Sequence, residues 1–153
     1  MPGDRAIVGH IVAMRWDTIE YGDLVTLFRE LRTVYDKTGR PVIYLAIQDD
    51  AYREPRAEVT QALKLRFPEM MKVIKINYLV IRATGIKASL QRRFLKTVLT
   101  AARLARIADL DRVVIVATVE EVLRREADDL PAPASEIMAE FRRVGVLPAN
   151  PYL

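Results

Sequence analysis

The acidic residues that follow one predicted strand are the first candidates for chemistry in this chain. Asp49 and Asp50 follow the apolar run Val42–Ile47 after one residue, Gln48, and Tyr52 and Glu54 lie in the same loop. Paired carboxylates could bind Mg²⁺ or act as a general acid and a general base. Solvated carboxylates are the more common outcome in such loops, so we expect these four residues to form a binding surface and no metal site.

The chain contains few side chains that could act as nucleophiles in catalysis. The chain has no cysteine, one histidine (His10) and two serines, Ser89 and Ser135. Neither serine lies in a G-x-S-x-G elbow, and a Ser–His–acid triad could only use His10, which falls inside a predicted strand. The lack of cysteine also excludes disulfides, thiolate-bound zinc and iron–sulfur clusters. We therefore predict a protein that is not an enzyme and has no catalytic residues, metal or cofactor.

The segment Thr84–Ser89 combines one glycine, one lysine and two hydroxyl groups between a predicted strand and a predicted helix. Free N–H groups at a helix N-terminus favour anions, so a phosphate could bind there beside Gly85 and Lys87. The chain contains neither G-x-G-x-x-G nor G-x-x-x-x-G-K-[ST], and a single glycine is a weak signal. An ordinary strand–helix turn is the simpler interpretation.

Charge is unevenly distributed along the chain. The formal net charge is only +4, but residues 70–108 hold nine basic residues and no acidic ones. The helix predicted in this segment would carry a basic, partner-binding surface made of Lys87, Arg92, Arg93, Lys96 and Arg103. Such a surface suits an acidic protein surface, anionic lipid headgroups or a nucleic-acid backbone, unless neighbouring carboxylates neutralise it. Nucleic acid is the least favoured partner, because we expect no exposed aromatic residues between the basic ones and see no motif of a DNA-reading helix.

Length and composition limit the class of protein. The chain has 153 residues, of which 51% are apolar, which is enough for one domain with a sizeable core. There is no stretch of about 18 apolar residues and no charged-then-apolar leader, so we expect neither a transmembrane segment nor a secretory signal. These properties predict a soluble, cytoplasmic protein.

Short β-branched runs alternate with longer helical stretches, which is typical of an α/β domain with a mainly parallel sheet. Four strands are predicted, at about Ala6–Arg15, Val42–Ile47, Ile76–Ala83 and Arg112–Ala117. Because strand–helix–strand crossovers are right-handed, a flavodoxin-like order 2-1-3-4 is the simplest arrangement. Its ligand crevice would lie beyond the carboxyl ends of the first and third strands. That switch-point crevice would be lined by Trp16, Asp17, Thr18, Thr84, Gly85, Lys87 and Ser89.

Helical spacing and terminal residues locate the first three helices. A capping box at Asp17–Glu20 and a stop at Gly39 bound the first helix. Pro55 opens a second helix that Pro68 should break. The third helix, at about Ala88–Ala108, should bury one apolar face. That face consists of Leu90, Phe94, Leu95, Val98, Leu99, Leu104 and Ile107.

The C-terminal part contains two further helices. A capping box at Thr118–Glu121 opens a short fourth helix that ends near Glu126. A Pro-rich linker after Leu130 separates it from an added helix at Ser135–Val144, which either packs on its own domain or docks on a second subunit. We therefore divide the chain into an α/β domain at 1–130 and a C-terminal helix with a Pro-rich tail at 131–153.

Several short patterns occur in a characteristic order. They are Trp16–Glu20 leading into an amphipathic helix, Val42–Ile47 before a polar loop, Phe67–Met71 closing the second helix, and Val113–Val116 followed by Thr118–Val122. Over about residues 6–126 this layout resembles a STAS domain, specifically its SpoIIAA-like branch. The resemblance implies a non-catalytic regulatory module that works by binding partners. The serine that opens the second helix in phosphorylation-switched members is replaced here by Glu54-Pro55-Arg56, so we do not expect that switch.

These observations give one leading hypothesis and two alternatives. The leading hypothesis is a regulatory or scaffold protein, a homodimer, that binds an acidic protein surface through the basic third helix and the loop before the second. The first alternative is a carrier of a lipid or an anionic small ligand, with an apolar pocket under the broken second helix at Phe67–Ile74 and a headgroup near Lys87. The weaker alternative is an acid/base or Mg²⁺-dependent enzyme at Asp17, Asp49 and Asp50.

Overall fold

The chain begins with a β-hairpin where the sequence predicts a single strand. In the computed structural model, which describes residues 4–82, 84–104 and 109–149, β1 (Asp4–Val8) pairs antiparallel with β2 (Ile11–Trp16). The turn needs Gly9, whose φ of 55° lies in the left-handed region and whose missing side chain leaves room for Pro131. The prediction of one strand at Ala6–Arg15 is wrong because a two-residue turn interrupts an otherwise continuous apolar run.

The five strands lie in the sheet in the order in which they occur in the chain. The strands that follow the hairpin, all parallel to β2, are β3 (Val42–Gln48), β4 (Ile74–Ile81) and β5 (Val113–Val116). The α/β class and the mainly parallel sheet are confirmed, whereas the predicted four strands in the order 2-1-3-4 are wrong. Since the crossovers never reverse direction, the sheet has no switch point of the flavodoxin type.

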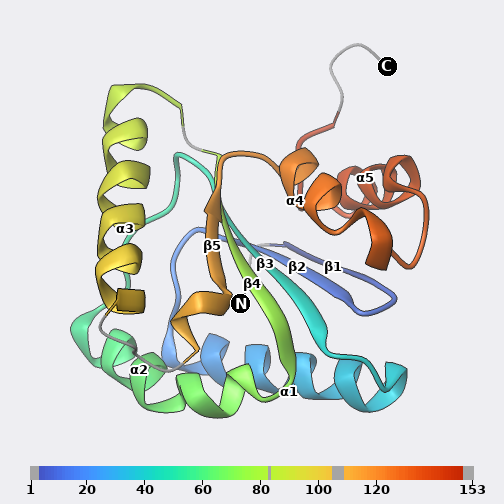
Figure 1. Cartoon of the computed structure of the whole chain (residues 1–153), viewed down its shortest axis with the longest axis horizontal. Helices are drawn as coiled ribbons and strands as arrows, with labels where there is room; N and C mark the ends of the chain where they lie inside the picture. The colour runs from blue at the N-terminus through green and yellow to red at the C-terminus, as the bar shows by residue number, and fades with distance from the viewer. Residues whose placement is uncertain (1–3, 83, 105–108, 150–153) are drawn as a thin grey trace.

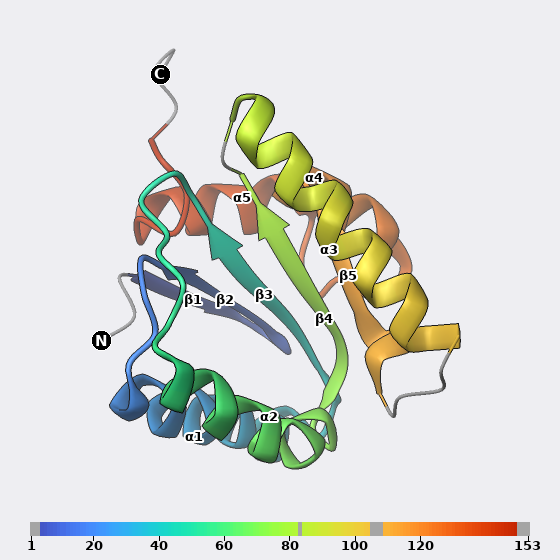
Figure 2. The same cartoon turned by 90° about the vertical axis from the view of Figure 1, so that its left-hand side faces the viewer.

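Helices cover both faces of the sheet (Figures 1 and 2). Helices α1 (Tyr21–Thr38) and α2 (Ala57–Met71) lie on one face, and α4 (Val119–Arg125) and α5 (Ala134–Arg143) lie on the other. Short 3-10 turns at Leu110–Arg112 and Ala127–Asp129 precede β5 and follow α4. No helix among the described residues is long and apolar enough to cross a membrane.

Alternating residues of the central strand, β3, pack in two separate hydrophobic cores on the two faces of the sheet. In β3, Ile43, Leu45 and Ile47 pack with α4 and α5, while Val42, Tyr44 and Ala46 pack with α1 and α2. This division follows from the two-residue period of a strand covered on both faces. The C-terminal helix joins the first core, where its Ile137 and Phe141 are fully buried, so α5 packs on its own chain.

Several helix ends differ from the predicted ones, and α2 begins at Ala57, two residues after Pro55. Helix α1 starts three residues later than expected, and the carboxylate of Asp23 accepts a hydrogen bond from the backbone N–H of Glu20 at 2.9 Å. Helix α2 continues past Pro68 to Met71 without the expected break. Pro68 lies in the last turn of α2 and removes only one backbone N–H donor, so the other backbone hydrogen bonds keep the helix intact up to Met71. The expected cap of α4 is present, since Thr118 Oγ1 accepts from the N–H of Glu121 at 3.2 Å.

Helix α3 (Ile86–Leu104) stands apart from the other helices on its side of the sheet (Figure 2). Leu90 and Phe94, which were expected to point inward, are 58% and 67% exposed, so that part of the prediction is wrong. Leu95 and Leu99 are half-buried, whereas the side chains of Val98 and Leu104, and all of Ile107, lie outside the described residues. Helix α3 thus presents one apolar stripe to solvent and another to the sheet.

A candidate ligand cavity between the sheet and three helices

An apolar cavity of about 520 Å³ lies between the sheet and helices α1, α2 and α3. We call it the inner cavity. Its floor is formed by β3 and β4, its walls by Leu24 and Leu27 of α1, and its roof by side chains of α2 and α3. The roof residues include Leu63, Phe67 and Met70 of α2 and Leu95 and Leu99 of α3. The cavity exists because α3 stays away from α2, so the face of the sheet between them is only partly covered.

Two polar groups from neighbouring strands lie on the floor of the inner cavity. Tyr44 of β3 and Asn77 of β4 are register partners, so both side chains project from the same face of the sheet. Trp16, at the end of β2, donates from Nε1 to the hydroxyl oxygen of Tyr44 at 2.9 Å. Burial raises the pKa of Tyr44 well above its ordinary value, against the opposing effect of this hydrogen bond. The Tyr44 hydroxyl therefore stays protonated and can donate a hydrogen bond.

Asn77 is the exceptional residue of this floor. Its side chain is only 6% exposed, and its Oδ1 atom has no hydrogen-bond partner among the described residues. Leaving a buried acceptor unpaired costs about 1–3 kcal/mol, and native structures contain few such atoms. Asn77 also lines the inner cavity, so a ligand bound there is a candidate source of the missing donor.

A second, more polar cavity of about 610 Å³ opens beside the inner one. We call it the outer cavity. The two cavities are adjacent and share Gln48, Tyr52, Glu54 and Gln91. We call this shared, mostly polar boundary the neck. The outer cavity is further lined by Asp49 and Asp50, by Thr84, and by the exposed Leu90 and Phe94 of α3.

Hydrogen bonds hold the acidic side of the outer cavity in place. Asp49 pairs with the guanidinium of Arg82 at 2.9 Å, and Asp50 accepts from the backbone N–H of Thr84 at 3.3 Å. Burial, followed by the charge of Glu54, raises the pKa of Tyr52. The predicted second-helix loop of Asp49, Asp50, Tyr52 and Glu54 is therefore brought together around one opening.

The predicted switch-point crevice is not formed. Trp16 lines the inner cavity and Thr84 the outer one, but β3 separates the strands that precede them. Asp17 is exposed and pairs with Arg15 at 3.1 Å, and Thr18 is exposed beside it. The remaining crevice residues, Gly85 and Ser89, are not among the residues that line either cavity.

Two residues of the predicted basic surface on α3 form hydrogen bonds within the chain. Arg92 donates to the carbonyl of Ile81 at 3.0 Å, and Arg103 donates to the carbonyls of Leu110, at 3.3 Å, and Val113. These two arginines thus attach α3 to β4, to β5 and to the 3-10 turn before β5. Arg93 and Lys96 are exposed on the outer side of α3, and the side chain of Lys87 lies outside the described residues.

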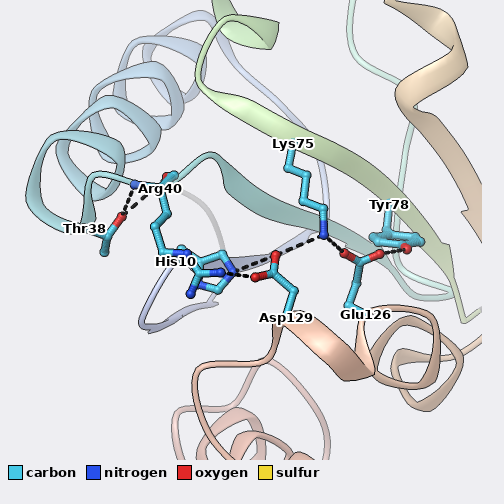
Figure 3. A network of polar contacts seen from close by, with 7 residues as sticks. All are labelled: His10, Thr38, Arg40, Lys75, Tyr78, Glu126 and Asp129. Carbon is cyan, nitrogen blue, oxygen red and sulfur yellow. Dashed lines mark hydrogen bonds and ion pairs between the residues drawn. The ribbon is translucent and has the colours of Figure 1, made fainter.

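A polar network at the opposite end of the strands was not predicted from the sequence (Figure 3). Lys75 bridges Glu126 and Asp129 at 2.7 and 3.0 Å, while the buried Tyr78 donates to Glu126 at 2.6 Å and His10 contacts Asp129 at 3.2 Å. The hydrogen bond from Lys75 lowers the pKa of Asp129. The only sequence feature that could have indicated this network is the three-residue spacing of Glu126 and Asp129, which places both acids on one side of a helical turn.

This network has a structural role in the described part of the chain. Arg40 adds a further hydrogen bond to Asp129, so the turn after α4 is joined to β4 and to the segments before β2 and β3. None of its residues lines the inner or the outer cavity. Among the described residues there is also no group of three or more His, Cys, Asp or Glu side chains that could hold a metal ion.

Comparison with known proteins gives no relative on which to base a function. No family model matches the chain, and neither a curated protein nor a solved structure matches it. The functional argument therefore rests on the two cavities and their residues.

Proposed function

We propose that this protein binds a small, mostly apolar molecule in the inner cavity. The observation that carries the proposal is that this cavity is lined by Asn77, a buried residue whose amide oxygen Oδ1 is unpaired among the described residues. The proposal corresponds to the carrier that the sequence offered as the alternative to a protein-binding module. Two residues of the segment that suggested the carrier, Phe67 and Met70 of α2, are part of the cavity lining.

Size, lining and polar groups all support this function. Ligand cavities commonly measure about 300–1,000 Å³ and combine mainly apolar walls with a few polar groups that orient the ligand. The inner cavity falls in this range, and its polar floor offers Asn77 as an acceptor and the hydroxyl of Tyr44 as a donor. A hydroxyl or amide group on the ligand would satisfy both. Filling the cavity would also recover the dispersion contacts that its apolar lining now lacks.

Trp16 provides a direct test because it is the only tryptophan in the chain and it lines the cavity. We expect a neutral amphiphile, dodecanol, to change the Trp16 fluorescence saturably and to raise the melting temperature. The substitution Ala46→Phe fills the floor of the cavity and should weaken binding at least about tenfold, which is about 1.4 kcal/mol. The matched substitution Ala127→Phe, at an exposed position away from the cavity, should not weaken it. Equal binding by both variants, or no saturable binding by the wild type, would contradict the proposal.

A second proposed function is association with an acidic protein surface through α3. Ile86, Leu90 and Phe94 are all more than half exposed on this helix, and Arg93 and Lys96 lie beside them. An exposed apolar stripe next to basic residues is typical of an interaction surface. The same charges disfavour direct pairing of two α3 helices from two copies of the chain.

Charge reversal tests this second function separately from ligand binding. A protein captured by the wild type should be lost with the double variant R93E/K96E. It should be retained by K64E/R66E, which makes the same charge change on exposed residues of α2. Arg92 is left unchanged because its hydrogen bond to Ile81 attaches α3 to the sheet. Undiminished capture by R93E/K96E would show that α3 is not the interface.

A further inference from the structure

The charged residues that line the outer cavity, in the part of the chain that the structure describes, are acids. They are Asp49, Asp50 and Glu54. Asp49 is neutralised by Arg82, whose guanidinium lies 2.9 Å from its carboxylate. Asp50 accepts a backbone N–H, and Glu54 forms no ion pair among the described residues. Two carboxylate charges therefore remain at the opening.

These carboxylates are part of a site that shows independent signs of binding a ligand. The outer cavity adjoins the inner one at the neck, where both are lined by Gln48, Tyr52, Glu54 and Gln91. Asn77, whose side chain is more than nine-tenths buried and whose Oδ1 is unpaired among the described residues, lines the inner cavity. A ligand held by Asn77 would extend through this neck toward the acidic opening.

Aromatic side chains at the opening favour the same kind of ligand group. Phe94 is 67% exposed and lines the outer cavity, and Tyr52 lies at the neck. The face of an aromatic ring attracts a cation, and the attraction adds to that of nearby carboxylates. An anionic headgroup would meet repulsion from Asp50 and Glu54 instead.

We infer that the ligand is a cationic amphiphile. Its body, apolar except for a group that donates to Asn77, would lie in the inner cavity, and its ammonium group would lie in the outer one. The inference rests on the proposed function of the inner cavity and adds the chemical class of the ligand. It differs from the expected anionic headgroup near Lys87, whose side chain lies outside the described residues, because the described charged residues that line the opening are acids. Selectivity then comes from the opening, and the inner cavity supplies the apolar contact.

Three probes with the same apolar chain test the inference: dodecylamine, dodecanol and dodecanoate. We expect Trp16 fluorescence titrations, below the concentration at which the probes form micelles, to give dodecylamine at least about tenfold tighter binding than dodecanol. Dodecanoate should bind more weakly than dodecanol. Added salt should reduce the preference for the amine, because the opening is partly exposed and its charges are screened.

Paired substitutions identify the source of the preference. The variant D50N/E54Q should lose most of the preference for the amine over the alcohol. The variant E58Q/D128N changes the net charge equally at exposed positions that do not line the cavities, and it should keep the preference. If dodecanol binds and dodecylamine binds no tighter, or if D50N/E54Q keeps the preference, the inference is wrong and the proposed function still stands. If none of the three probes binds, both fail.

Discussion

At the scale of single residues, Asn77 combines a cost in stability with a use in binding. Its amide oxygen is buried without a partner in the described structure, beside the apolar residues of the inner cavity. Binding sites often retain groups that destabilise the empty protein, since those groups are satisfied only by the ligand. This trade-off gives a prediction that does not require the ligand to be known.

The substitution Asn77→Leu should stabilise the ligand-free protein. Leucine has a similar shape and leaves no unpaired acceptor, so the free energy of unfolding should rise by about 1–3 kcal/mol. Urea denaturation followed by circular dichroism measures the change. Asn77→Asp is the matched variant, and it should lower stability because it buries an unpaired carboxylate. Loss of stability in Asn77→Leu would mean that the amide makes hydrogen bonds in the folded protein.

The sequence indicated some of these residues and not others, for physical reasons. The loop residues Asp49, Asp50 and Glu54 were recognisable because polar groups after an apolar strand must lie at an edge of the sheet. Asn77 was not recognisable as a site residue from the sequence. It interrupts the apolar run of β4, and only the pairing of β4 with β3 shows which face of the sheet it occupies. Trp16 was expected at a ligand site, and it lines a cavity that differs from the predicted crevice.

At the scale of elements, local patterns predicted the strands and helices better than their arrangement. Hydrophobic periodicity identifies a buried strand but carries no information about its neighbour in the sheet, so the strand order required the structure. The hairpin at Gly9 was hidden because both of its strands are apolar. The predicted break at Pro68 is wrong because a helix tolerates the loss of one N–H donor near its end.

Helix α3 shows why an apolar stripe does not by itself define the buried face. Its sequence has two such stripes, one with Leu90 and Phe94 and the other with Leu95 and Leu99, and each satisfies helical periodicity. The structure directs the second stripe to the sheet, where Arg92 and Arg103 bind backbone carbonyls of neighbouring segments. The first stripe is left at the opening of the outer cavity, where apolar and aromatic contacts are useful for binding.

At the scale of the whole molecule, the sheet separates two cores that each contain a buried tyrosine. Tyr44 belongs to the core with α1 and α2, and Tyr78 belongs to the core with α4 and α5. Burial raises the pKa of both hydroxyls, and for Tyr78 the hydrogen bond to the carboxylate of Glu126 raises it further. Both tyrosines must therefore stay neutral while the protein is folded.

This arrangement predicts that the protein loses stability in alkaline solution. Because both pKa values are higher in the folded than in the unfolded protein, the unfolded chain releases these protons first, above its own tyrosine pKa of about 10. The two groups leave stability unchanged below that pH, and above it the free energy of unfolding should fall as pH rises toward the folded pKa values. Urea denaturation at neutral and alkaline pH measures the slope. The variants Tyr44→Phe and Tyr78→Phe should each reduce it, whereas Tyr21→Phe, at an exposed position, should not. An unchanged slope in both core variants would show that these hydroxyls ionise as readily in the folded protein as in the unfolded one.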